Sequence, residues 1–128
     1  MRTEVSKAID ELHRQFPDAR IAATEDGSGG AYVVVEPVSI GSRFVPESTW
    51  IGGHLTAQYP YADVYPVFIG ADVRRGDGAG LHSPVTSGHT FAGRSALQVS
   101  RRTATAEQTP QSAVVKFLKV LHFLEKSA

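Results

Sequence analysis

The chain contains no cysteine among its 128 residues. Disulfide bonds, thiolate metal sites and a thiol nucleophile are therefore excluded within it. It also lacks a surplus of either charge, because Lys and Arg together number 13 and Asp and Glu together number 13. A protein that neutralises nucleic-acid phosphates usually carries a basic excess, so we expect no nucleic-acid partner.

Long apolar runs are missing as well. A membrane-spanning helix needs about 18 or more consecutive apolar residues, and the sequence has no stretch of that kind. The first residues, from Met1 to Glu4, lead into a mixed-charge segment and not into the apolar run of a signal peptide. We therefore expect a cytoplasmic protein with no membrane partner, folded as one domain over residues 1–128.

Helical periodicity is present near both ends of the chain. In the first helix Thr3 is a candidate cap and Pro17 a stop, and in the last Thr109 is a candidate cap followed by Pro110. Lys116, Lys119 and Lys126 are expected to form a basic edge of the last helix. The expected buried positions are Val5, Ala8, Ile9, Leu12 and Phe16 in the first helix, and Val114, Phe117, Leu118, Leu121 and Leu124, widened by Val115, Val120 and Phe123, in the last.

Four segments have the composition of strands: residues 20–24, 31–36, 48–55 and 67–69. A glycine-rich turn predicts a hairpin between the first two, and the paired Gly52 and Gly53 predict a β-bulge. From Gly70 to Arg94 periodicity is lost, which predicts a long functional or mobile loop. The expected fold is therefore α+β: an N-terminal helix, an antiparallel four-stranded meander, a long active-site-type loop and a C-terminal helix.

Three short patterns, taken in order, resemble the prokaryotic branch of the ubiquitin-conjugating-enzyme family. They are Tyr59-Pro60 with Tyr65-Pro66 and the apolar residues 67–69; a histidine in the following loop, His82 or His89; and residues 91–102, followed by Gln108-Thr109-Pro110 and the last helix. The resemblance covers most of the chain. It implies the ubiquitin-conjugating fold and two partners, a ubiquitin-like protein and its activating enzyme.

The sequence departs from that family at its reaction centre. Neither His82 nor His89 is followed by Pro-Asn, so the family's His-Pro-Asn motif and its oxyanion-stabilising asparagine have no clear counterpart. Aligning Gly93 with the glycine before the family's catalytic cysteine puts Ala96 at the nucleophile position, next to Ser95. The resemblance thus places the site within residues 91–102, at a point where the thiol is missing.

Three explanations of the missing thiol are open. In the first, Ser95 or Ser100 holds the C-terminus of a ubiquitin-like protein as an oxyester, with His89 or His82 as general base. In the second, the chain is a catalytically inactive module that binds a ubiquitin-like protein or positions a partner. In the third, Ala96 stands where the natural chain has a cysteine.

The candidate binding residues follow from the same resemblance. Loop amides or Arg94 are candidates for stabilising an oxyanion, and Arg101 and Arg102 for contacting an acidic or polar tail of a partner or for bracing the loop. The full set of candidate binding residues is Arg94, Gln98, Ser100, Arg101, Arg102, Tyr59 and Tyr65.

Two further functions fit the sequence less well. A zinc site at Asp77, His82 and His89 would have no standard ligand spacing. The arginine pairs Arg74-Arg75 and Arg101-Arg102 lie on a neutral chain, where such pairs are more often salt-bridged or in contact with a protein partner. We therefore expect neither a metal nor a cofactor.

Overall fold

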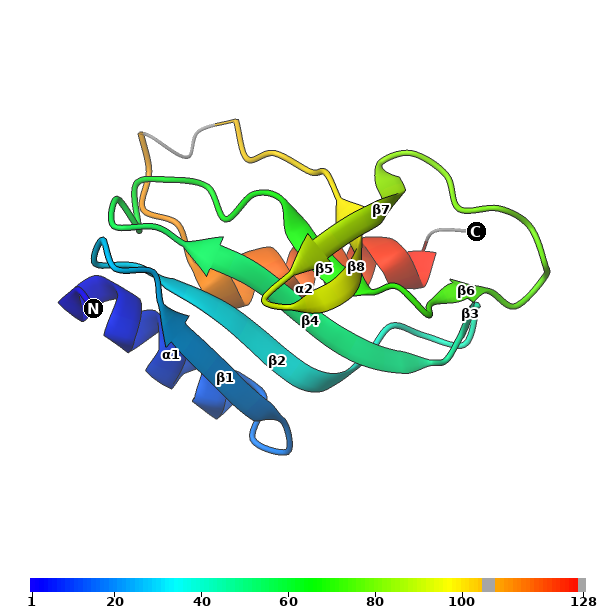
Figure 1. The fold of residues 1–128 in the computed structure, drawn as a ribbon, viewed down its shortest axis with the longest axis horizontal. Helices are drawn as coiled ribbons and strands as arrows, with labels where there is room; N and C mark the ends of the chain where they lie inside the picture. Colours follow the sequence, from blue (N-terminus) through cyan, green and yellow to red (C-terminus); the bar gives the residue numbers. More distant parts are fainter. Residues whose placement is uncertain (105–107, 127–128) are drawn as a thin grey trace.

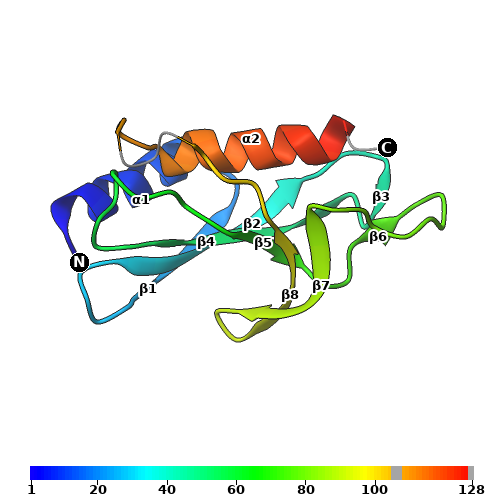
Figure 2. The same cartoon turned by 90° about the horizontal axis from the view of Figure 1, so that it is seen from above.

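Two helices lie on one face of an antiparallel β-sheet (Figure 1). The computed structural model describes residues 1–104 and 108–126. Helix α1 spans Thr3–Gln15 and helix α2 spans Ala113–Lys126. Figure 2 shows both helices on the same side of the sheet, which confirms the α+β class with a helix at each end. Within the described residues, neither helix is long and apolar enough to cross a membrane.

The main sheet has six antiparallel strands in the order β1-β2-β4-β5-β8-β7, and the short strands β3 and β6 pair separately. The strands of the main sheet are β1 (Arg20–Glu25), β2 (Ala31–Ser39), β4 (Ser48–Leu55), β5 (Val67–Gly70), β7 (Val85–Phe91) and β8 (Arg94–Val99). The two short strands are β3 (Phe44–Val45) and β6 (Arg74–Arg75).

Strands β1, β2, β4 and β5 match the four predicted strands, but the prediction of a four-stranded sheet is wrong. The segment expected to be a long loop contains β6 and β7, and β8 follows it. Val85, Thr86, Thr90 and Phe91 in β7 favour a strand, but Ser87, Gly88 and His89 interrupt them, so no continuous strand pattern is present. The backbone hydrogen bonds of β7 come from pairing with β8, a contact that composition does not encode.

The β7–β8 hairpin turns through Ala92 and Gly93, whose φ angles are +50° and +77°. Two consecutive positive φ angles are typical of a tight two-residue hairpin turn, and glycine adopts them without steric cost. The hairpin packs closely against β4. A Cβ atom on Gly52 would lie only 2.7 Å from the Phe91 ring. Gly52 therefore provides the space in which Phe91 is seated.

The predicted bulge at Gly52 and Gly53 is wrong. Both glycines keep regular register with β2, and the irregularity lies in β2 itself, between Val35 and Val38. These glycines serve close packing instead, since a Cβ atom on Gly53 would lie 2.7 Å from Val64 on the helix side of the sheet.

Helix α1 packs the predicted face against the sheet. Val5, Ala8 and Leu12 are buried, and the helix ends just before Pro17 as expected. The predicted cap at Thr3 is wrong, because Thr3 is already helical and the capping residue is Arg2, which makes no side-chain capping bond. A backbone bond from the Arg2 amide to the Gly29 carbonyl ties this end to the β1–β2 turn instead.

Helix α2 begins later and is rotated relative to the prediction. The cap is Ser112, whose Oγ accepts the Val115 amide proton at 3.1 Å, and not Thr109. Leu118 and Val115, expected to be buried, are 38% and 48% exposed, whereas Lys116, expected on the basic edge of the helix, is 6% exposed. The buried side of α2 consists of Ala113, Lys116, Phe117, Val120, Leu121 and Leu124.

Candidate functional site

The β7–β8 hairpin carries the candidate nucleophile and base, but on opposite faces. Ser95 pairs with Thr90, and Ala96 pairs with His89. Opposed residues in antiparallel strands share a face while successive residues alternate, so the Ser95 hydroxyl and the His89 ring point in opposite directions. Among the described residues, the Ser95 hydroxyl has no hydrogen-bond partner, and therefore no general base in this structure.

Ala96, at the expected nucleophile position, is 1% exposed. It faces a second hydrophobic cluster on the sheet face opposite the helices, formed with Val34, Trp50 and Phe91. Three rings of this cluster stack: Phe68 on Phe91 at 4.8 Å and Phe91 on Trp50 at 6.3 Å between centroids. We call Trp50, Phe68 and Phe91 the outer aromatic cluster. A side chain at position 96 would therefore lie beneath rings and out of reach of a partner.

His89 has a different hydroxyl partner from the one expected. Its Nε2 lies 2.9 Å from the Thr86 Oγ1, and its ring packs edge-on against Phe68. Thr86 and His89 flank a bulge at Ser87 and Gly88 that brings the two side chains together. Neither the spacing of hydroxyl residues nor the resemblance indicated Thr86, because the bulge that creates the contact depends on the pairing with β8.

The remaining candidates near Ser95 have structural partners. The Arg94 guanidinium donates to Glu36 at 3.0 Å and lies 5.5 Å from the centre of the Trp50 ring. The Gln98 amide donates to the Ser100 hydroxyl at 2.9 Å. The sequence predicted none of these contacts, which hold the hairpin and its neighbours together.

His82 lies in the turn before β7 and is exposed. Its carbonyl accepts the Val85 amide proton at 2.9 Å. In the part of the chain that the structure describes, the His82 ring has no hydrogen-bond or ion-pair partner. The structure therefore brings His82 to neither Ser95 nor Ser100 as a hydrogen-bonded base.

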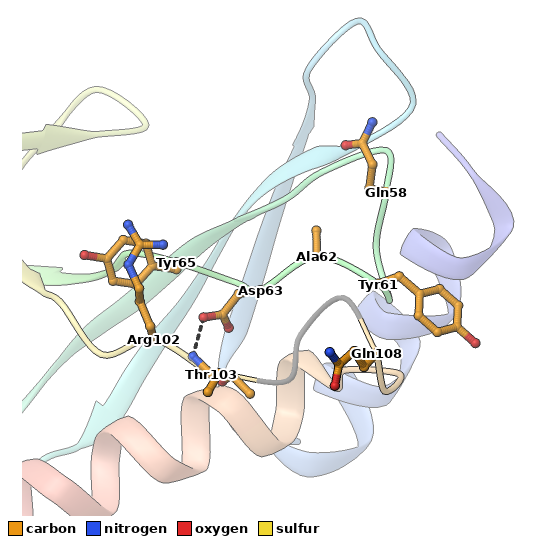
Figure 3. Close-up of a pocket in the computed structure, with 9 residues that line it drawn as sticks. Gln58, Tyr61, Ala62, Asp63, Tyr65, Arg102, Thr103 and Gln108 are labelled. Atoms are coloured by element: carbon orange, nitrogen blue, oxygen red, sulfur yellow. Dashed lines mark hydrogen bonds between the residues drawn. The ribbon is translucent and has the colours of Figure 1, made fainter.

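Tyr65 and Arg102, two candidate binding residues, do come together (Figure 3). The Arg102 guanidinium lies 4.0 Å from the centre of the Tyr65 ring, at one end of a pocket of about 510 Å³. The other lining residues are Gln58, Tyr61, Ala62, Asp63, Thr103, Ala104 and Gln108. Arg101 extends to the other side of the same segment, where its guanidinium lies 4.5 Å from the centre of the Phe123 ring in α2.

Beneath the two arginines lies a buried ion pair that the sequence analysis missed. Lys116 Nζ lies 2.9 Å from Asp63 Oδ1, with side-chain exposures of 7% and 13%. The same ammonium donates to the Arg101 carbonyl and the Thr103 hydroxyl, and the other Asp63 oxygen accepts the Thr103 amide proton at 2.6 Å. We call Asp63, Arg101, Thr103 and Lys116 the Lys116 junction.

A signal for the Lys116 junction was present in the sequence. Lys116 follows Ala113 by three residues and precedes Val120 by four, the spacing of one helix face. A lysine on an apolar helix face requires a buried anion nearby. The identity of that anion could not be read from the sequence, because Asp63 lies 53 positions away.

Tyr59, the remaining candidate binding residue, belongs to the core. It is 5% exposed, and its hydroxyl oxygen accepts the amide proton of Ala113, the first residue of α2, at 3.0 Å. Burial raises the pKa of the Tyr59 phenol, because the charged phenolate would be desolvated. Tyr59 thus secures the start of α2 rather than an exposed binding surface.

A His–Asp contact lies in a region that the sequence analysis did not single out. His54 Nε2 is 2.7 Å from Asp26 Oδ2, and the other Asp26 oxygen accepts the amide protons of Ser28 and Gly30. These bonds, the one to His54 above all, lower the pKa of the Asp26 carboxyl. Tyr32 stacks on the His54 ring at 4.3 Å. The contact joins the β1–β2 turn to β4.

The zinc alternative has no support from the arrangement of its three residues. Asp77 forms an ion pair with Arg75 at 2.7 Å, which lowers the pKa of the Asp77 carboxyl, and His89 contacts Thr86. Over residues 1–104 and 108–126, no three His, Asp or Glu side chains are grouped as metal ligands would be.

Comparison with known proteins adds no family to this geometry. The chain matches no protein-family profile, no curated protein and no solved structure.

Proposed function

We propose that the chain is a catalytically inactive binding module of the ubiquitin-conjugating fold, which holds a ubiquitin-like protein within a conjugation pathway. The element order supports the fold assignment: α1 is followed by β1, β2, β4 and β5, which are neighbours in the main sheet, and α2 is the last element described. This is the order that the sequence resemblance implies. Strands β6 and β7 lie within the segment expected to be the active-site loop, and β8 follows it.

The observation that carries the inactive assignment is the burial of Ala96. At 1% exposure beneath the outer aromatic cluster, position 96 offers no route for the C-terminal carbonyl of a partner, whichever residue occupies it. The neighbouring Ser95 is exposed but lacks a base, and a serine hydroxyl is a weak nucleophile without one. Non-covalent binding needs neither group.

A second candidate function rests on the contact between Thr86 and His89. With Nε2 unprotonated, His89 would accept the Thr86 proton as the hydroxyl oxygen attacks the thioester carbonyl of a ubiquitin-like protein carried by its activating enzyme. The C–S bond then breaks, the thiolate leaves and an oxyester to Thr86 remains. His89 is half-buried against Phe68, and Thr86 is exposed.

An adduct assay separates the two candidates. The chain is incubated with ATP and with the ubiquitin-like protein and activating enzyme of the same genome, and the products are separated under denaturing conditions. The proposal predicts no adduct and, in parallel, retention of the ubiquitin-like protein on the immobilised chain. An adduct that resists thiols, is cleaved by hydroxylamine and is lost in Thr86→Ala but kept in Thr86→Ser would instead establish the oxyester.

Two variants make the assay sharper. Ala96→Cys should form no thioester, because the introduced thiol is buried; a thiol-sensitive adduct on this variant would show that position 96 is an accessible reaction centre and would overturn the proposal. Ser95→Ala should behave as the parent chain in both the adduct and the retention measurement. Loss of an adduct in Ser95→Ala would restore the serine mechanism.

A further inference from the structure

A second concave surface adjoins the Lys116 junction on the α2 side. It has a volume of about 360 Å³ and lies between the segment after β8 and helix α2. Val120 and Phe123 supply its apolar part, and its cationic or titratable side chains are Arg101, Arg102, Lys119 and His122, besides Lys116. We call this surface the Arg101 groove.

The charge of the Arg101 groove is one-sided. Its described lining contains no carboxylate. Asp63, at its base, already pairs with Lys116 in the junction, and among the described residues Arg101, Arg102 and Lys119 have no carboxylate partner. This local excess occurs on a chain whose formal net charge is zero. The arrangement attracts an anionic ligand.

The side chains of Arg101 and Arg102 are pre-organised by stacking on aromatic rings. Arg101 lies over Phe123 and Arg102 over Tyr65, so each guanidinium has one face against a ring. Stacking fixes the plane of a guanidinium and leaves its N–H edge available for bidentate bonds to a carboxylate. The backbone between them is fixed by the bond from Lys116 Nζ to the Arg101 carbonyl. Less side-chain freedom is therefore lost on binding.

Apolar surface continues from the groove along α2. Val115 and Leu118 are 48% and 38% exposed, and both neighbour Lys119 on the next hollow of the helix surface. Exposed apolar side chains rimmed by charge are typical of protein–protein contacts. A nucleic acid would leave this apolar strip unused, and it would require more than a few cations.

We infer that the Arg101 groove binds an extended acidic segment of a partner protein. Carboxylates of the segment pair with Arg101 and Lys119, and an apolar side chain packs on Phe123. This inference deepens the proposed function and rests on it, in that the groove becomes the recognition surface of the binding module.

The test uses a fluorescein-labelled peptide, Glu-Leu-Glu-Glu-Leu-Glu, and measures its anisotropy with the full chain. We expect saturable binding with a dissociation constant below about 1 mM, weakened at least about tenfold in Arg101→Glu and in Lys119→Glu. Lys7→Glu is the matched control. It makes the same charge change at an exposed position of α1 and should leave the affinity unchanged. Binding should also weaken as salt is raised.

Both groove variants are expected to fold. The Arg101 and Lys119 side chains are exposed, and the junction uses the Arg101 carbonyl and not its side chain. A melting temperature within a few degrees of the parent confirms this for each variant. If Arg101→Glu alone fails to fold, Lys119→Glu still decides the outcome.

Three results would overturn the inference. The first is the absence of peptide binding up to about 1 mM. The second is equal affinity for the peptide with Gln in place of each Glu, which would remove the role of charge. The third is preferential binding of a short labelled oligothymidylate, which would make the groove a nucleic-acid site.

The failure of this inference can be told apart from failure of the proposed function. If the ubiquitin-like protein is retained equally by the parent and by Arg101→Glu, the binding module stands and the groove is not its recognition surface. If the acidic peptide binds at the groove but no ubiquitin-like protein is retained, the groove stands and the proposed function fails.

Discussion

The β7–β8 hairpin and the Lys116 junction use polar residues in opposite ways. Along the hairpin, Ser95 and Thr90 are exposed, and the attachment to the sheet is apolar, through Phe91. At the junction, Asp63, Thr103 and Lys116 are largely withdrawn from water and bonded to one another. Hydroxyl residues thus mark a solvated strand in this protein, whereas the hydrogen-bonded polar network lies where charges are buried.

The largest expected effect comes from breaking the junction. Lys116→Met removes the ammonium and leaves the Asp63 carboxylate buried, which should lower the free energy of unfolding by about 4 kcal/mol. Urea unfolding followed by circular dichroism measures it. Lys119→Met, three residues on and exposed, is the control and should cost less than about 0.5 kcal/mol.

The partner residue provides a second check on the junction. In the double variant Lys116→Met/Asp63→Leu the unpaired buried charge is gone, so the loss should be clearly smaller than the sum of the two single losses. Additive losses, or a cost below about 1 kcal/mol for Lys116→Met, would contradict the account of a coupled buried pair.

The hairpin is tested through the ring that attaches it. Phe91→Ala removes a ring 7% exposed and should lower the free energy of unfolding by about 3 kcal/mol. Gly52→Ala probes the same contact from the other side, because the added methyl group would meet the Phe91 ring and should cost about 1 to 3 kcal/mol. If Gly52→Ala is neutral in the parent chain, the hairpin is not seated on β4 as described.

A smaller effect is expected at the hydrogen bond between Tyr59 and the start of α2. Tyr59→Phe leaves the Ala113 amide proton without its acceptor and should cost about 1 kcal/mol in urea unfolding. Tyr61→Phe is the control, because Tyr61 is 53% exposed.

The same tyrosine makes the stability of the protein depend on alkaline pH. Its pKa is raised by burial, so its contribution to stability is complete below the ordinary value near 10.0 and is lost as pH rises through the higher folded-state value. The parent should therefore lose stability faster than Tyr59→Phe between about pH 9 and 11. Parallel profiles for the two proteins would contradict the pKa assignment.

The stability of the protein at acidic pH tests the contact between Asp26 and His54, which lies on the hairpin side of the sheet. Because the pKa of Asp26 is lowered, its contribution is complete above the ordinary value of 3.8 and is lost as pH falls through the lower folded-state value. Asp26→Asn should be less stable than the parent at pH 6, with the difference shrinking toward about pH 2. Asp10→Asn, an exposed change in α1, should show no such convergence in urea unfolding.

Much of the fold could be predicted from local pattern. The apolar steps from Val5 to Leu12 indicated the buried face of α1, and the β-branched residues indicated β2 and β4. β7 escaped prediction because Ser87 and Gly88 interrupt its strand-forming residues at the bulge, and only the pairing with β8 shows that the strand continues through them. Of the candidate site, the sequence indicated Tyr65 and Arg102, which the structure places together, but it assigned Ser95 a base that lies on the other face.

The sequence by itself determined that no thiol chemistry occurs within this chain, that a helix forms near each end and that the strands between them form an antiparallel sheet, because composition and periodicity are local properties. Only the tertiary structure decided that Lys116 faces inward while Leu118 faces outward, and that His89 contacts Thr86 instead of Ser95. Periodicity shows which residues share a face. The element that covers that face depends on contacts such as Lys116 with Asp63, across 53 positions of the chain.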